Sequence, residues 1–417
     1  MAEEETKATL TKGLPEGFKM TELGALPNDW QVVKLGDVMK EVNERVNHYT
    51  FPMPSILPVL SLTKNDGLVL QSERFEKRIA TEDVSNYKIV RRDQIVYNPY
   101  VIWEGAIHIL RRYEIGLVSP VYIVLSTIKE SADPHFLDLW LRTPPAINAY
   151  NKYAAGAVNR RRSIRKKDFF RIRAPLPPLP EQRAIAHVLR TVQRAKEATE
   201  QVIAALKEFK KSLMRYLFTY GPVPIEQADK VELKDTEIGL VPAHWEVKKL
   251  GDVAKVMYGK AKPTNMRGNI PVIGSGGIYS WTTEPLINFA TLIIGRKGTA
   301  GQVWLCELPC WPSDTTFYLK WKSLEILDVR FIYGWFLFNP LSGEHAKTTI
   351  PSLQRPDLEN YPIPFPSLDE QKKIAEILIS LDNKIKAEEN KKSALETLFK
   401  TLLHNLMTGK IRVANVE

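Results

Sequence analysis

The sequence predicts an α/β (α+β) protein with two globular α/β domains, related by an internal pseudo-two-fold repeat and separated by an antiparallel two-helix coiled coil. Three observations predict this class. Residues 20–38 return as residues 235–253, with 11 of 19 positions identical. Short apolar runs bounded by Gly, Pro, Asn and Asp follow each copy, as strands and turns do. Each copy then ends in a proline-rich strip and a long seven-residue apolar repeat.

Length and composition limit the class of protein. A chain of 417 residues is long enough for two to four domains, and its net charge of +10 fits an anionic partner without requiring one. Two cysteines indicate no disulfide framework, and their CxxxC spacing lacks companion zinc ligands. The N-terminus carries no signal peptide, and the longest apolar run, 331–338, is far short of the roughly 20 residues of a membrane span. We expect a soluble, cytoplasmic protein that does not enter membranes.

The first globular domain is expected at residues 19–178 and the second at 235–366. Their strands are expected within six apolar or alternating runs, at 57–63, 87–98, 117–126, 270–277, 291–296 and 315–321. Each domain should also hold a short helix, because Phe136 and Trp140 in the first copy match Phe331 and Trp335 in the second. Residues four apart lie on one helical face, so this pair should dock on the domain core.

A long helix is expected after each domain, at 179–221 and 367–410, with a linker at 222–234. Apolar positions alternate spacings of three and four, at 185, 188, 192, 195, 199, 202, 206, 209, 213, 216 and 220, and at 374, 378, 381, 385, 395, 399, 402 and 406. Glu388 and Lys392 interrupt the second stripe, either paired with each other or solvated. About 40 residues span roughly 60 Å, and a lone helix with one apolar stripe is unstable in water, so the two helices should pack together.

Enzyme motifs are incomplete in the sequence. Asn98-Pro99-Tyr100 is similar to the Asn-Pro-Pro-Tyr of amino-methyltransferases, but it lacks the second proline and a glycine-rich cofactor loop. A turn after a strand is therefore the favoured interpretation. A phosphate-binding GxxxxGK[ST] loop is also missing, and the seven histidines are scattered.

Asp357 with Glu370-Gln-Lys372 imitates a nuclease motif, but the repeat argues for a structural role. The first copy has Glu181-Gln-Arg183 at the same place, so Glu-Gln opens the long helix in both halves. Ser367 and Glu370 have the spacing of a capping box. We expect no catalytic residue and no metal ligand in this chain.

Basic residues mark the end of the first domain. Eight of the fourteen residues between Arg160 and Arg173 are Arg or Lys, and Asp168 is the only acidic residue among them. Such a run is commonly a solvated face, but here its counterpart in the second copy is not basic. We expect phosphate contacts from Arg160, Arg161, Arg162, Arg165, Lys166 and Lys167, which would supply affinity and not sequence preference.

In the second domain, Gly274-Ser-Gly-Gly277 and Arg296-Lys-Gly-Thr-Ala-Gly301 combine flexible backbone with cations. These glycines indicate tight turns or, alternatively, a backbone that approaches a phosphate or a base edge closely. Arg296 is the strongest candidate for reading guanine. Tyr279 and Trp281 belong either to the core or to the contact surface. The candidate DNA-binding residues here are Lys260, Lys262, Ser275, Tyr279, Arg296, Lys297 and Gln302.

The chain resembles the specificity subunits of Type I restriction–modification systems. The residues that carry the resemblance are Leu176-Pro-Pro-Leu-Pro-Glu-Gln-Arg-Ala-Ile-Ala186 and Ile363-Pro-Phe-Pro-Ser-Leu-Asp-Glu-Gln-Lys-Lys-Ile-Ala375, with the repeated openings that end at Gly36-Asp37 and Gly251-Asp252. Ile350-Pro-Ser-Leu353 also fits, whereas the first copy has Arg162-Ser-Ile-Arg165 there and lacks the proline. The resemblance covers about residues 20–412.

The resemblance implies a non-catalytic subunit that recognises double-stranded DNA with a bipartite target, one half for each domain. It also implies two methyltransferase (modification) subunits docked on the helices and restriction/translocase subunits in the full complex. No cofactor is expected in this chain, while S-adenosylmethionine, ATP and Mg are expected on the partner subunits. The alternatives are a stand-alone two-headed DNA-binding regulatory or architectural protein and, less in keeping with the motifs, an enzyme in its own right.

Overall fold

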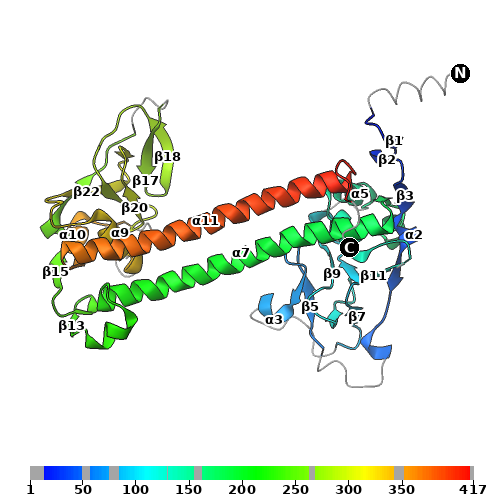
Figure 1. Ribbon diagram of the computed structural model, residues 1–417, viewed down its shortest axis with the longest axis horizontal. Coiled ribbons are helices and arrows are strands. Elements are labelled where there is room, and N and C mark those ends of the chain that lie inside the picture. Colours follow the sequence, from blue (N-terminus) through cyan, green and yellow to red (C-terminus); the bar gives the residue numbers. More distant parts are fainter. Residues whose placement is uncertain are drawn as a thin grey trace. The chain divides into compact units, whose positions relative to one another are not determined.

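The computed structural model describes residues 14–48, 57–74, 84–128, 130–154, 162–262, 268–341 and 352–413. The chain forms two compact units. Unit 1 contains the described residues within 1–197 and 393–417, and unit 2 contains those within 198–392. Both units combine strands with short helices, and two long helices each contribute one half to each unit (Figure 1).

Unit 1 is built around a four-stranded antiparallel sheet with the order β4-β11-β8-β9. These strands are β4 (Met39–Val42), β11 (Ile123–Thr127), β8 (Ile95–Tyr97) and β9 (Ile107–Ile109). The other strands pair two by two: β1 (Phe18–Thr21) with β2 (Gly24–Pro27), β3 (Gln31–Lys34) with β12 (Arg173–Leu176), β5 (Leu60–Leu62) with β6 (Leu68–Leu70), and β7 (Lys88–Arg91) with β10 (Ile115–Val118).

The helices of unit 1 are short apart from its share of the two long ones. They are α2 (Leu35–Val38), α3 (Gln71–Arg74), α4 (Pro134–Trp140), α5 (Pro144–Tyr153) and α6 (Lys166–Phe169), with single 3₁₀ turns at Val46–His48 and Ile102–Glu104. Phe136 and Trp140 of α4 are buried in the main core, as their spacing predicts. Asp133 caps α4 by accepting hydrogen bonds from the backbone N–H groups of His135 and Phe136.

Unit 2 repeats the same main sheet in the order β16-β22-β19-β20. These strands are β16 (Ala254–Tyr258), β22 (Thr316–Trp321), β19 (Thr291–Gly295) and β20 (Val303–Cys306). A three-stranded sheet joins β18 (Gly277–Thr282), β17 (Ile270–Gly274) and β21 (Trp311–Pro312), while β13 (Leu233–Thr236) pairs with β14 (Gly239–Pro242) and β15 (Glu246–Lys249) with β23 (Pro362–Phe365). Its short helices are α8 (Leu250–Val253), α9 (Val329–Phe338) and α10 (Arg355–Glu359), with a 3₁₀ helix at Ile225–Lys230.

The predicted mixed fold and internal repeat are confirmed. The six predicted runs all contain strands, and the runs at 87–98 and 117–126 each hold parts of two strands with a turn between them. Asp93 forms the first of these turns in the left-handed conformation, with φ of 66°. Asp tolerates that region better than most side chains. Phe331 and Trp335 on α9 are buried in the core of unit 2, as Phe136 and Trp140 are in unit 1.

A buried glutamine explains the Glu-Gln pair that opens each long helix. The long helices are α7 (Leu179–Tyr220) and α11 (Leu368–Met407). The Gln182 amide accepts a hydrogen bond from Asp133 N–H and donates to two backbone carbonyls. Gln371 repeats the arrangement with Asp328 N–H and two carbonyls. Ser367 and Glu370 form the predicted capping box.

The two long helices pack antiparallel within each unit. In unit 1 Lys196 on α7 pairs with Glu396 on α11 at 3.3 Å. In unit 2 Lys207 pairs with Glu389 at 2.7 Å, and Lys392 with Glu200 at 3.0 Å. Along these pairs the residue numbers increase on α7 while they decrease on α11, so the helices run in opposite directions. The predicted antiparallel helix pair is confirmed within both units.

One detail of the predicted α7 stripe is wrong. The stripe predicts that Val202 and Phe209 face the buried side, but their side chains are 43% and 55% exposed, while Ile203 and Met214 are buried. The stripe was drawn with a strict seven-residue period, whereas a straight α-helix of 3.6 residues per turn drifts by about 20° per heptad. By mid-helix the buried face has moved to the neighbouring positions.

Among the helices of the described part of the chain, none has the length and apolarity that crossing a membrane requires.

Candidate nucleic-acid interface

The structure brings the predicted contact residues of unit 2 around one loop, Pro312–Thr315. Lys260 N–H donates to the Pro312 carbonyl, and Ser275 N–H donates to the Thr315 hydroxyl. Arg296 N–H donates to the Thr315 carbonyl, and the Gln302 carbonyl accepts from Gly295 N–H. The side chains of Lys260, Lys262, Tyr279, Lys297 and Gln302 are exposed, and those of Ser275 and Arg296 are half-buried.

Arg296 is held in place on three sides. Its guanidinium lies over the Tyr258 ring at 5.2 Å and over the Phe317 ring at 5.8 Å. One of its terminal nitrogens donates to the Asp314 carbonyl at 2.8 Å, and its Nε is buried with no hydrogen-bond partner among the described residues. A fixed, partly satisfied guanidinium has little conformational entropy left to lose on binding a base edge or a phosphate.

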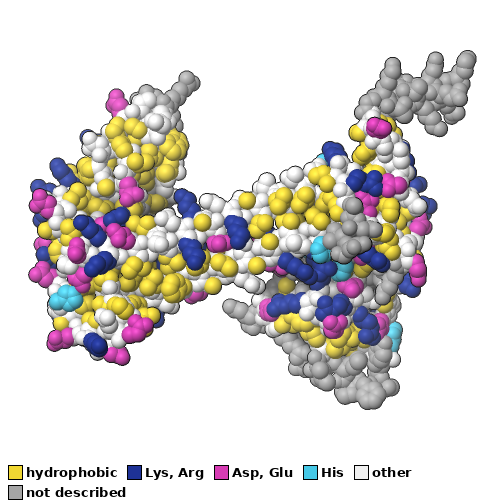
Figure 2. All heavy atoms as spheres, viewed as in Figure 1, with side chains coloured by type: hydrophobic (Ala, Val, Ile, Leu, Met, Phe, Trp, Pro, Cys, Tyr) yellow, Lys and Arg dark blue, Asp and Glu magenta, His cyan; other side chains and the backbone are white. Residues whose placement is uncertain are grey.

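The hairpin β17–β18 presents apolar side chains to solvent beside these cations. Tyr279 is 53% and Trp281 is 47% exposed, which removes the alternative that either belongs to the core. Both project from β18 at a spacing of two, and Lys262 lies over the Tyr279 ring at 5.8 Å. Figure 2 shows hydrophobic side chains gathered over this hairpin. Exposed aromatic rings next to cations are typical of surfaces that stack on or wedge against bases.

The basic cluster of unit 1 is more neutralised than its sequence suggests. Arg165 pairs with Asp168 at 2.7 Å, as expected from local sequence, but Lys166 pairs with Glu41 at 2.6 Å. Arg162 lies over the Trp103 ring at 5.0 Å and donates to a backbone carbonyl. Lys167 is exposed. Arg160 and Arg161 lie outside the described residues.

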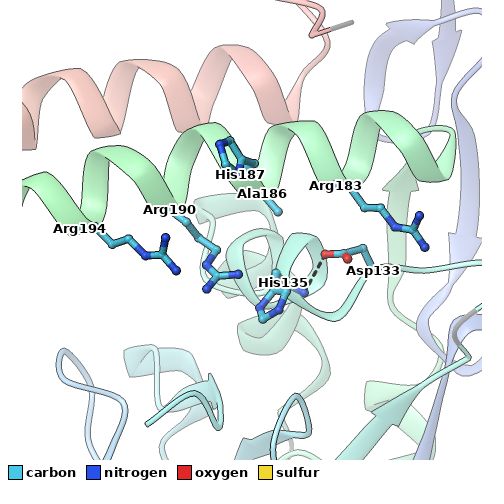
Figure 3. Close-up of a pocket in the computed structure, with 7 residues that line it drawn as sticks. All are labelled: Asp133, His135, Arg183, Ala186, His187, Arg190 and Arg194. Atoms are coloured by element: carbon cyan, nitrogen blue, oxygen red, sulfur yellow. Dashed lines mark hydrogen bonds between the residues drawn. The ribbon is translucent and has the colours of Figure 1, made fainter. Parts of the chain in front are cut away.

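Sequence reasoning missed a second basic group, on α7. Arg183, His187, Arg190 and Arg194 follow one another at spacings of four, three and four, so they share one helical face. Together with Asp133 and His135 of the α4 start they line a cavity of about 230 Å³ in unit 1 (Figure 3). Figure 2 shows Lys, Arg and His side chains gathered on unit 1 next to α7. The signal was present in the sequence as a basic stripe beside the apolar one.

Two buried ionisable groups of unit 1 are explained by packing. Asp138 accepts hydrogen bonds from Arg111 at 2.6 Å and Arg142 at 2.8 Å. Burial opposes its charge, but the two guanidinium groups hold the pKa of this carboxyl below its usual range. Burial lowers the pKa of His108 to about 4, and its Nε2 lies 3.0 Å from the Lys64 carbonyl. Packing and these contacts inside the domain therefore account for both pKa shifts.

Cys306 and Cys310 are both buried and unbridged. The Cys306 thiol donates to the Leu308 carbonyl at 3.2 Å. Within the described ranges, no group of three or more His, Cys, Asp or Glu side chains is placed to hold a metal ion.

The family model described as "Type I restriction modification DNA specificity domain" matches residues 27–208 and 242–397. The putative type I restriction enzyme MjaX specificity subunit of Methanocaldococcus jannaschii is 27% identical over 430 residues, which cover 95% of this chain and 97% of the relative. The MjaVIII specificity subunit of the same organism is 27% identical over 440 residues, covering 96% and 97%.

A solved structure shares the fold. The Type-I restriction-modification system S subunit from M. genitalium superposes with a TM-score of 0.64 at 16% identity, covering 93% of this chain and 99% of the other. The likeness of fold therefore extends over nearly the whole chain.

Proposed function

The chain belongs to the Type I restriction modification DNA specificity domain family, and we propose that its two units each read one half of a bipartite double-stranded DNA target. The observation that carries the proposal is the duplication seen in three dimensions. Both units hold the same four-strand order, yet the segments around those sheets differ. Two related but unequal readers on one chain suit a target with two unequal halves.

We infer that the contacts in unit 2 centre on Arg296. Its guanidinium is the candidate for a bidentate contact to guanine, and Lys260, Lys262 and Lys297 are candidates for phosphate contacts. Ser275, Tyr279 and Gln302 surround it. In unit 1 the candidates are Arg162, Arg165, Lys166 and Lys167, with Arg160 and Arg161. The ion pairs of Arg165 and Lys166 would have to be exchanged for phosphates on binding.

We further propose that α7 and α11 dock two modification subunits, and that restriction/translocase subunits join this assembly. Support comes from the exposed Val202 and Phe209 on α7, since large apolar side chains on a solvent face favour a protein contact. In this proposal the chain is not itself an enzyme. S-adenosylmethionine, ATP and Mg belong to the partner subunits, and the assembly works in the cytoplasm.

The test is to produce the chain with its modification subunits and map methylated adenines on random DNA. The expected result is a two-part motif with a fixed unread gap. Arg296→Ala should lower the discrimination between bases at one position of one half-site by about 1–3 kcal/mol. The base preferences of the other half-site should not change.

Two results would count against the proposal. Methyl transfer or cleavage by the chain alone would make it an enzyme. Binding to a two-part target without association with a methyltransferase would indicate a stand-alone regulator instead.

A further inference from the structure

The basic cavity in unit 1 lies between the start of α4 and the first half of α7. In Figure 3 Arg190 extends from α7 toward His135, with Arg183 and Arg194 along the same helix on either side. The Arg183, His187 and Arg194 side chains are exposed, and Arg190 is half-buried. Three guanidinium groups thus surround a volume of about 230 Å³ that is large enough for a tetrahedral oxyanion.

The cavity has more positive charge than its own carboxylates use. Among the described residues, the Arg183, Arg190 and Arg194 side chains make no hydrogen bond or ion pair. The Asp133 carboxylate is already engaged, because it caps α4 by accepting from two backbone N–H groups at 2.9 and 3.0 Å. The three guanidinium groups outnumber the one carboxylate in the lining, so they repel one another, and a bound anion would offset that cost.

His135, at the floor of the cavity, also has a polar atom without a partner among the described residues. Its Nδ1 is buried and has no hydrogen-bond partner among the described residues, while its Nε2 lies 3.4 Å from Asp93. Burial, followed by the charge of Arg190, lowers the pKa of this imidazole, although Asp93 and Asp133 oppose the shift. Because Nε2 faces the Asp93 carboxylate, Nδ1 is an acceptor in the neutral ring. An anion in the cavity would favour the doubly protonated imidazole, whose Nδ1–H can donate to it.

Unit 2 supplies an internal comparison, because the repeat places different residues at these positions. The counterparts of Arg183, His187, Arg190 and Arg194 on α11 are Lys372, Glu376, Ile379 and Asn383. Arg330, the counterpart of His135, is neutralised by Asp328 at 2.6 Å. The neighbouring cavity in unit 2 is lined by two cations, Lys210 and Arg330, by the carboxylates of Glu307 and Asp382, and by apolar side chains. Lys210 pairs with Asp382 at 2.5 Å. Among the described residues, the cations of the unit 1 cavity therefore lack the carboxylate partners that those of the unit 2 cavity have.

We propose that the unit 1 cavity binds a phosphate group of the DNA backbone, with Arg190 and Arg194 as its main ligands and Arg183 and His135 in support. This inference rests on the proposed function. Arginine suits the role because its planar fork pairs with phosphate oxygens. A carboxylate of a modification subunit is the weaker alternative. Two identical partners docked on a repeated chain would each need such a site, whereas the cations lining the described unit 2 cavity are already paired with carboxylates.

The test compares two double variants of the full chain that lose the same charge. Arg190→Gln with Arg194→Gln removes the cavity ligands. Arg215→Gln with Lys386→Gln removes two exposed cations from α7 and α11 in unit 2, away from the cavity. Duplex binding is measured from 50 to 200 mM salt. The cavity variant should bind every duplex more weakly, with a salt slope shallower by about one, while the control keeps the slope of the unchanged chain.

A second measurement separates backbone phosphate from free phosphate and checks folding. Inorganic phosphate, at ionic strength matched with chloride, should raise the melting temperature of the unchanged chain and of the control but not of the cavity variant. Without phosphate, the cavity variant should melt at or above the temperature of the unchanged chain, because grouped charges are removed.

The results that overturn the inference are distinct. An unchanged salt slope with a lost phosphate effect means that the site takes free phosphate and not DNA. An unchanged slope with no phosphate effect in any variant means a solvated face. A changed slope that appears only in the presence of modification subunits means a protein contact. In each case a two-part methylation motif would still support the proposed function, so the two proposals fail separately.

Discussion

The two copies of the repeat share their buried hydrogen bonds but differ in the residues that they expose on the long helices. Gln182 and Gln371 each bind one backbone N–H and two carbonyls, and Trp30 and Trp245 each donate to the glutamate that precedes that glutamine. From the next residue onward, α7 carries the basic stripe of Arg183, His187 and Arg190, where α11 carries Lys372, Glu376 and Ile379. Buried hydrogen bonds fix how each helix leaves its domain, whereas the exposed face one turn away is free to take a separate role.

The largest effect is expected from breaking the shared glutamine. Gln182→Leu or Gln371→Leu leaves three backbone groups without partners, at about 1 kcal/mol or more each, so about 3 kcal/mol should be lost from the unit concerned. Calorimetry should show a lower melting temperature for the unit 1 transition in Gln182→Leu and for the unit 2 transition in Gln371→Leu. Similar losses would support the equivalence of the copies.

A matched control is Gln→Glu at the same positions, which keeps the acceptor for the N–H group and loses the donors. A variant that melts like the unchanged chain would show that the glutamine is dispensable in that copy, and the equivalence would then be superficial.

The next effect is a difference between the units in how their stability depends on pH. His108 lies on β9, and β20, the strand in its place in unit 2, contains no histidine. With a pKa near 4 in the folded state and about 6.5 in the unfolded state, the unfolded chain binds more protons between these values, so stability falls as pH decreases through that window, by up to about 3 kcal/mol.

Lowering the pH from 7 to 5 should therefore lower the melting temperature of unit 1 more than that of unit 2, as measured by calorimetry. The glutamine variants show which transition belongs to which unit. His108→Gln keeps a donor for the Lys64 carbonyl and removes the titration, so the difference should shrink. If unit 2 loses as much stability, His108 is not the cause.

The sequence was a good guide wherever a pattern is local. Alternation and turn residues located the strands, and the Phe and Trp spacing located α4 and α9. It failed at Val202 and Phe209, because a small error in helical period accumulates along 42 residues. The contact between Trp30 and Glu181 spans 151 positions, and a single sequence contains no signal for that pairing.

The candidate site was predicted in part for the same reason. The unit 2 residues lie together because glycine turns and strand ends gather at one loop, a rule that the sequence carries. Lys166, by contrast, meets Glu41 from a distant strand, so counting local charge overstated the free charge of its cluster. The α7 basic stripe could have been found, since its spacing of four, three and four is the same signal that revealed the apolar stripe beside it.

A smaller effect tests how each copy holds its glutamate. Glu181 accepts from Arg412 at 2.6 and 2.9 Å, and Arg412 also pairs with Asp29. Glu370 accepts instead from the exposed His244 at 2.9 Å. Arg412→Ala should cost about 1–2 kcal/mol because a nearly buried carboxylate loses two charged donors. His244→Ala should cost less than about 0.5 kcal/mol, since that side chain is well solvated. Urea unfolding of the two variants would measure the difference in unfolding free energy. A larger loss for His244→Ala than for Arg412→Ala would contradict the prediction.

The smallest effect concerns the charges between the helices. Lys207 and Glu389 are both about half exposed, so neutralising either by Lys207→Gln or Glu389→Gln should change the unfolding free energy by less than about 0.5 kcal/mol. Leu378→Ala, by contrast, removes a buried α11 side chain from the unit 2 core and should lower the unfolding free energy several-fold more than either charge variant. Unfolding in low and high salt distinguishes the two contributions, because screening weakens exposed ion pairs and leaves apolar burial intact. A strong salt dependence would mean that charge, and not the apolar stripe, holds α7 against α11 in unit 2, and the similarity of the two interiors would then extend less far along the helices than the glutamines indicate.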